Sequence, residues 1–224
     1  MNYSDIQVKK PWGYEYLVYK NDEVALWYLY IKDKHSTSMH CHPNKTTGLI
    51  LLDGKATISF MNDSFNLNPI SKTMIRKGLF HSTRASSKNG AHVFEIESPV
   101  DKHDLVRLED NYGRKGKPYE SAEFQKPKKA DSLWLEEPQI NSSNEYNFLN
   151  CKIFIIKTSN IKDLTLETIN DNIVFLDGGI STKEGILVAQ PGDVLSNNTL
   201  NKLINLFPSS IQNTIYMTIS KKLK

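Results

Sequence analysis

The sequence predicts an all-β protein, built as an antiparallel sandwich or barrel. Short runs rich in β-branched and aromatic residues recur along the 224-residue chain, and each run ends at Gly, Asn, Asp or Pro. Two of these runs are separated by Asp53-Gly54, which is a strong signal for a hairpin turn. With 39% hydrophobic and 24% charged residues, the composition is that of a globular chain rather than a disordered one.

The expected strands fall into two groups. The first half contains five apolar, β-branched or aromatic runs, at 24–31, 48–52, 56–60, 73–75 and 92–96. The second half contains four, at 152–156, 172–176, 185–189 and 214–219. Between the groups the composition shifts to Lys, Pro, Glu, Ser and Asn, and the only apolar cluster is Leu133-Trp134-Leu135. We therefore expect a first β domain over 1–114, a connecting segment over 115–147 with Trp134 in a groove of that domain, and a second β domain over 148–224.

A short internal repeat links the two halves. Leu51-Leu52-Asp53-Gly54 recurs as Phe175-Leu176-Asp177-Gly178. The repeat suggests that the second half is a degenerate copy of the first, and chance similarity of two hairpin sequences is the alternative. The second half contains no histidine, so any histidine chemistry belongs to the first half.

Charge and cysteine content narrow the class of protein. A formal net charge of +3 and an isoelectric point near 8.6 are too mild to indicate a nucleic-acid partner. No apolar run approaches the roughly 20 residues that a membrane-spanning helix needs, and residues 1–6 lack the apolar core of a signal peptide. Only Cys41 and Cys151 are present, which is typical of a reducing compartment, so we expect a cytoplasmic protein without membrane or nucleic-acid partners.

Three histidines carry most of the functional information. His40 and His42 form a His-x-His pair, and on a β-strand such a pair points both imidazoles to one face while Cys41 points to the other. His81, on a second expected strand, would complete a set of three nitrogen donors that leaves coordination positions open on a divalent metal ion. The remaining histidines are expected to be ordinary surface or core residues: His35, His92 and His103.

These residues resemble the two sequence motifs of the cupin superfamily. His40-Cys41-His42, followed by Thr47 and Gly54, matches the first motif except that Thr47 stands at the acidic ligand position. The segment 76–81, which ends in His81, matches the second, with Ala85 at the usual Asn position. The resemblance implies a jelly-roll β-barrel, and it implies a bicupin if the second half is a degenerate copy of the first. It also implies one divalent ion held by the three histidines. The ion could be Zn, Mn, Fe, Co or Ni, and the sequence does not identify it.

The flanking segments resemble a narrower family. Residues 10–15 (KPWGYE) and 104–114 (DLVRLEDNYGR) are similar to the motifs that bracket the isomerase domain of type II mannose-6-phosphate isomerases. The resemblance implies a metal-dependent isomerase of sugar phosphates, and it implies a catalytic role for Arg114. The nucleotidyltransferase half of many such enzymes has no counterpart in this sequence.

The leading hypothesis is a metal-dependent sugar-phosphate or nucleotide-sugar isomerase or epimerase in carbohydrate or surface-polysaccharide biosynthesis. Glu97 is the candidate base, and Glu95 shares its face of one strand; both could instead form salt bridges. Cations near the predicted barrel mouth are candidates for binding a substrate phosphate: Arg76, Lys77 and Arg84.

Two alternatives remain open at the level of sequence. A non-catalytic cupin that binds sugars and acts as a regulatory or assembly subunit is favoured by Thr47 and by the eroded second half. A metal-dependent dioxygenase would share the three-histidine pattern. Homodimer formation through an apolar edge at 27–30 is also open.

Overall fold

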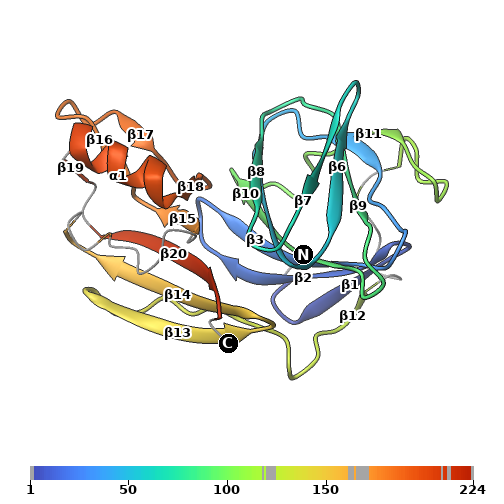
Figure 1. The fold of residues 1–224 in the computed structure, drawn as a ribbon, viewed down its shortest axis with the longest axis horizontal. Coiled ribbons are helices and arrows are strands. Elements are labelled where there is room, and N and C mark those ends of the chain that lie inside the picture. The colour runs from blue at the N-terminus through green and yellow to red at the C-terminus, as the bar shows by residue number, and fades with distance from the viewer. Residues whose placement is uncertain are drawn as a thin grey trace. The chain divides into compact units, whose positions relative to one another are not determined.

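The computed structural model describes residues 3–117, 119, 125–160, 164, 172–207, 209–210 and 213–222. The chain divides into two compact units, Met1–Trp134 and Leu135–Lys224, which are described separately. In Figure 1 the first unit runs from blue to green and the second from yellow to red.

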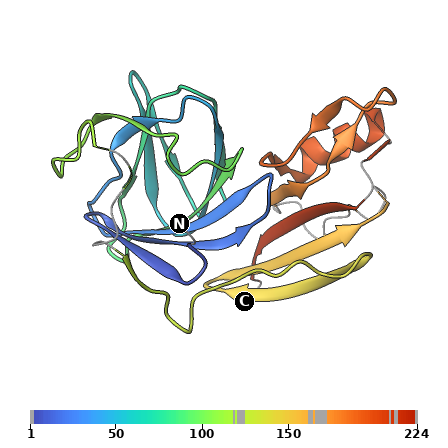
Figure 2. The same cartoon turned by 180° about the vertical axis from the view of Figure 1, so that it is seen from behind.

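The first unit consists of two antiparallel sheets (Figures 1 and 2). The larger sheet has the strand order β12-β1-β2-β3-β10-β5-β8, and the smaller has the order β11-β4-β9-β6-β7. The strands are β1 (Ile6–Lys10), β2 (Gly13–Lys20), β3 (Ala25–Ile31), β4 (Met39–Cys41), β5 (Thr46–Gly54), β6 (Ala56–Phe60), β7 (Ser64–Leu67), β8 (Lys72–Ile75), β9 (His81–Ala85), β10 (Ala91–Ser98), β11 (Val106–Glu109) and β12 (Gln125–Pro127).

The core of the first unit lies between the facing sheets. Leu29, Leu51 and Val93 come from the larger sheet, Ile58 and Ala85 come from the smaller one, and none is more than 3% exposed. Each of these positions is an apolar residue in a strand whose side chains alternate between faces, so one face of each sheet is removed from water. The expected all-β fold is confirmed, and the facing antiparallel sheets are those of a cupin jelly roll.

The Asp53-Gly54 pair does not form the hairpin that the sequence predicts. β5 pairs with β8 and β10, whereas β6 pairs with β7 and β9, so the chain passes at Gly54 from one sheet to the other. Gly54 has a φ of +87°, and a methyl group there would overlap the carbonyl oxygen of Gly90. The glycine is required by this crossing, since an L side chain would be strained and would clash.

The described residues of the second unit also form two sheets. Their strand orders are β13-β14-β20-β15-β18 and β17-β16-β19. The elements are β13 (Ser142–Phe148), β14 (Cys151–Thr158), β15 (Asn172–Asp177), β16 (Ile180–Ser181), β17 (Leu187–Ala189), β18 (Val194–Ser196), α1 (Asn197–Leu206), β19 (Ser209–Ser210) and β20 (Thr214–Lys221).

The repeated Leu-Asp-Gly sequence occupies similar places in the two units. β15 ends at Asp177, Gly178 has a φ of +67°, and the chain then enters β16 of the other sheet, as it does from β5 to β6. Among the described residues, the second unit differs from the first by a helix, α1, where the sequence predicted only strands. Ser196 caps α1 by accepting a hydrogen bond from the backbone of Thr199.

The expected connecting segment, 115–147, contributes strands to both units. β12 pairs with β1 in the first unit, whereas β13 pairs with β14 in the second; residues 118 and 120–124 lie outside the described part of the chain. Trp134 packs against the core of the first unit, with the Lys128 ammonium 4.6 Å from its ring centre. The domain boundaries after 114 and 147 stay a prediction. None of the described helices is long and apolar enough to cross a membrane.

Candidate metal centre

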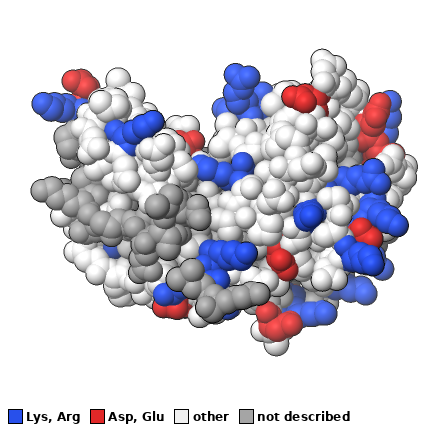
Figure 3. Space-filling model, viewed as in Figure 1, with Lys and Arg blue, Asp and Glu red and all other residues white. Residues whose placement is uncertain are grey.

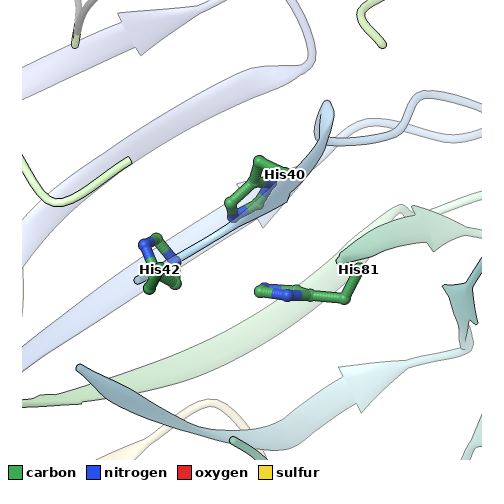
Figure 4. Close-up of side chains that lie close together, drawn as sticks. All are labelled: His40, His42 and His81. Carbon is green, nitrogen blue, oxygen red and sulfur yellow. The ribbon is translucent and has the colours of Figure 1, made fainter. Parts of the chain in front are cut away.

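Three imidazoles meet on the inner side of the smaller sheet. His40 lies in β4, His42 directly follows that strand, and His81 begins β9, where it is the register partner of His40. Figure 4 shows the three rings turned toward one another. One ligand nitrogen from each ring lies within 4.8 Å of the others, which is the spacing of groups that share one ion.

The orientation of each imidazole is fixed by the backbone. In all three rings Nδ1 lies within hydrogen-bond distance of a main-chain carbonyl, so Nδ1–H donates and the lone pair is left on Nε2. The distances from Nδ1 to the carbonyl oxygen are 2.8 Å for His40 and Ser38, 2.6 Å for His42 and Asp104, and 2.9 Å for His81 and Leu79. Nε2 of His42 is buried without a hydrogen-bond partner among the described residues, which is costly for a polar atom unless a ligand meets it.

Burial keeps these imidazoles neutral. It lowers the pKa of His42 and of His81 to about 4, and it lowers the pKa of His40 well below its ordinary value, where the neighbouring rings of His81 and His42 add to the effect. A neutral imidazole is the form that binds a metal ion. Three neutral nitrogen donors with fixed orientation and one orphaned Nε2 therefore fit a divalent cation.

No carboxylate joins the three histidines within the described residues. The acidic position of the motif is occupied by Thr47, which is 1% exposed and whose Oγ1 has no hydrogen-bond partner among those residues. Thr47 lies opposite Glu97 in the pairing of β5 with β10. An ion held here would keep its full charge, because its protein ligands are neutral.

Beside the histidines lies a buried network of opposite charges. The Lys45 ammonium is 2.8 Å from a Glu97 oxygen and donates to the Asp101 carbonyl oxygen at 2.9 Å. Lys102 lies 3.5 Å from Glu97 and 3.2 Å from Glu15. Burial by itself would raise the pKa of Glu97, but Lys102 and Lys45 outweigh it and hold that pKa well below the usual range.

One cavity joins His40 and His42 to this network and to the end of the YGR motif. Its lining includes His40, His42, Glu95, Glu97, Arg107 and Arg114. Arg107 is the register partner of His40 in β11 and is 9% exposed. The cavity therefore combines metal-binding nitrogens, three carboxyl groups (Glu15, Glu95 and Glu97) and two guanidinium groups.

Arg114 reaches this cavity while bound to Asp110. Its Nη2 lies 2.7 Å from Asp110 Oδ1, and its backbone N–H donates to Oδ2 at 2.8 Å. Its guanidinium also lies 5.4 Å from the ring centre of Tyr112. Arg114 therefore pairs with Asp110 and also lines the cavity.

The other cations named from the sequence lie elsewhere. Arg76, Lys77 and Arg84 are exposed and are not among the described residues that line this cavity. Figure 3 shows basic side chains on the surface alongside acidic ones.

The other histidines have partners of their own or are exposed. The His35 ring stacks on Tyr112, His92 Nδ1 is 2.6 Å from the Tyr28 hydroxyl, and His103 is exposed.

Sequence reasoning did not find Lys45, Lys102 or Arg107. Arg107 lies two residues after Leu105, and side chains two residues apart in a strand share a face. A period-2 pattern over 104–109 could therefore have placed Arg107 on the inner face. Lys45 and Lys102 lie 52 and 5 residues from Glu97 along the chain, and no local pattern pairs them with it.

Comparison with known proteins agrees with the fold and the motifs. The first unit has a cupin fold with a three-histidine site. Residues 2–110 match the family model described as mannose-6-phosphate isomerase C-terminal, which confirms the resemblance inferred from the bracketing motifs. No curated protein matches the chain.

Solved structures match at low identity. A double-stranded β-helix protein from Klebsiella pneumoniae is 12% identical, over 43% of this chain and 79% of its own, with a TM-score of 0.40. KdgF from a Halomonas species is 14% identical, over 43% and 89%, with a TM-score of 0.41. A putative sugar phosphate isomerase from Acidithiobacillus ferrooxidans is 18% identical, over 35% and 52%, with a TM-score of 0.33. At these scores the fold assignment depends on the sheet order and the family model.

Proposed function

We propose that the first unit is a metal-dependent isomerase or epimerase of sugar phosphates or nucleotide sugars. The observation that carries the proposal is the convergence of His40, His42 and His81 as neutral, oriented donors. His40 and His42 line a cavity that also holds carboxyl and guanidinium groups. The match to the isomerase family model favours a sugar as the substrate.

Different side chains would have different roles in the reaction. A divalent ion held by Nε2 of the three histidines would supply positive charge that polarises the carbonyl and neighbouring hydroxyl of an open-chain sugar. A carboxyl group on β10, Glu95 or Glu97, would move the proton between adjacent carbons. Arg114 and Arg107 would stabilise the negative charge that develops on oxygen, because fixed donors in a buried site need no reorganisation.

Binding of a phosphate is a separate part of the proposal. Arg114 offers a planar guanidinium at the cavity, and Arg76, Lys77 and Arg84 remain candidates only for a substrate that extends to the surface. The proposed partner is a small molecule, and the proposed setting is a cytoplasmic pathway of carbohydrate or surface-polysaccharide biosynthesis. A homodimer remains part of the proposal, but residues 27–30 do not form its edge, because β3 lies between β2 and β10 and Trp27, Tyr28 and Leu29 are buried.

The test is deuterium exchange. Wild-type protein loaded with Zn, Mn, Fe, Co or Ni is incubated in D₂O with hexose and pentose phosphates, and label at the carbon next to the carbonyl is followed by NMR. Exchange that is lost on chelation and in His40→Ala/His42→Ala supports the proposal. Absence of exchange with every metal and sugar, in protein shown to be folded and metal-loaded, would contradict it.

A non-catalytic sugar-binding role is the second candidate. It is favoured by Thr47 at the acidic ligand position and by the Lys45–Glu97 pair, which ties up a carboxylate beside the site. Calorimetric binding of a sugar phosphate that is unaffected by chelator, without exchange, would select this role.

A further inference from the structure

The two carboxyl groups on β10 differ sharply in their surroundings. Glu95 and Glu97 are two residues apart in one strand, so both point to the inner face, and both line the cavity that contains His40 and His42. Only one of them is positioned by partners.

Glu97 is held in place as a counterion. Its side chain is 2% exposed and is bracketed by Lys45 at 2.8 Å and Lys102 at 3.5 Å. Two ammonium groups stabilise its ionised form, and its fixed hydrogen bond leaves it little freedom to meet a substrate carbon. A carboxylate in this setting is a weak base.

Glu95 has none of these constraints. It makes no hydrogen bond or ion pair with any residue that the structure describes, and it lines the cavity. Its register partners are apolar residues on both neighbouring strands, Trp27 on β3 and Leu49 on β5.

We propose that Glu95 is the residue that transfers the proton in the isomerisation, and that Glu97 serves to anchor Lys45 and Lys102. This inference depends on the proposed function. In the step, the Glu95 carboxylate takes the proton from the carbon next to the carbonyl, and the C–H electron pair forms the carbon–carbon double bond of an enediolate. Glu95–OH then returns the proton to the former carbonyl carbon, while a hydroxyl proton moves between the two oxygens, so no oxidant or reductant is needed.

The electrostatic surroundings support this division of roles. Burial and the negative charge of Glu97 raise the pKa of Glu95 above its usual range, with Glu15 adding to the effect, while Lys102 and Lys45 oppose it. A carboxyl group whose pKa is moved toward neutrality is both an effective base and an effective acid.

The test compares isosteric variants in the metal-loaded protein. Glu95→Gln is expected to lower kcat by about 100-fold or more, with a much smaller change in KM and unchanged metal content. Glu95→Asp, which keeps the charge but shortens the side chain, is expected to retain part of the activity. Glu23→Gln, an exposed substitution outside the site, is the matched control for preparing and assaying a Glu-to-Gln variant.

Two outcomes overturn the inference in different ways. If wild-type protein catalyses exchange and Glu95→Gln retains it within a few-fold, the assignment to Glu95 is wrong while the proposed function stands. If wild-type protein catalyses no exchange, the proposed function fails and the assignment falls with it.

A third measurement does not depend on activity. A ¹³C NMR titration of glutamate-labelled protein should show one carboxyl titrating above the usual range that disappears in Glu95→Gln, and its absence would also overturn the inference.

Discussion

Removing Lys45 should destabilise the first unit by about 3 kcal/mol. The Lys45 and Glu97 side chains are 1% and 2% exposed and 2.8 Å apart, and breaking a buried pair by deleting one partner costs roughly 3 to 5 kcal/mol. The lower end of that range applies here, because Lys102 remains 3.5 Å from Glu97 and still offsets its charge. Lys45→Met keeps much of the side-chain volume, so the change isolates the lost charge and hydrogen bonds.

The assay is urea unfolding of the metal-free protein, with the double variant Lys45→Met/Glu97→Gln as the matched control. The double variant should recover at least half of the loss, since it leaves no unpaired buried carboxylate beside residue 45. A change below about 1 kcal/mol in Lys45→Met, with an unaltered urea slope, would refute the reasoning that a desolvated pair lies at this position.

The pH dependence of the same variant provides a sign test. The folded-state pKa of Glu97 is lowered from 4.5 to about 2, so its contribution to stability is fully present above about pH 4.5 and is lost as pH falls toward 2. Lys45→Met should raise that pKa and flatten this part of the stability curve. An unchanged curve would contradict the assignment of Lys45 as a partner that lowers it.

Further predictions concern Gly54, where the chain crosses between sheets, the three histidines of the metal centre, and Arg114. Gly54→Ala should lower the free energy of unfolding by more than about 1 kcal/mol, because φ is +87° and a methyl group would overlap the Gly90 carbonyl. Gly78→Ala is the control and should lower it less, because Gly78 has a φ of +72° but lies in open space. Equal losses of Tm in the two variants would contradict this reasoning. In metal-free protein the free energy of unfolding should fall as pH drops from about 6.5 toward 4. The cause is that the histidines of the unfolded chain bind protons in this range, whereas His42 and His81 in the folded protein stay neutral down to about pH 4. A His40→Ala/His42→Ala/His81→Ala variant with the same pH slope would argue against buried neutral rings. Arg114→Ala should reduce kcat at least about 10-fold with unchanged metal content, whereas full activity by the exchange assay would remove Arg114 from the mechanism.

The parts of the site that were predictable are those set by short-range geometry. Strand alternation alone places His40 and His42 on one side and Cys41 on the other, and the second motif places His81 on the next strand of the sheet. The β character of both units follows in the same way from apolar, β-branched and aromatic runs.

Other features depend on contacts between distant residues. Asp53-Gly54 correctly signals a positive φ, but a dipeptide does not specify which strands pair around it, and here the chain changes sheets. Lys102 lies in the loop between β10 and β11, and the pairing of its ammonium with Glu97 depends on how that loop folds back, so Lys102 carries no local signal. The helix α1 has its own local signals, namely the cap at Ser196 and the apolar spacing of Leu200, Leu203 and Ile204, but it is short and lies between β-rich runs that predict strands.

The most direct measurement of the central claim is anomalous diffraction at the metal edge from crystals of the metal-loaded protein. We predict one peak about 2.0 to 2.2 Å from Nε2 of His40, His42 and His81, with Nδ1 of each ring still bound to its carbonyl. A well-ordered, metal-soaked crystal with no peak among these rings, or with the ion bound through Nδ1, would contradict it.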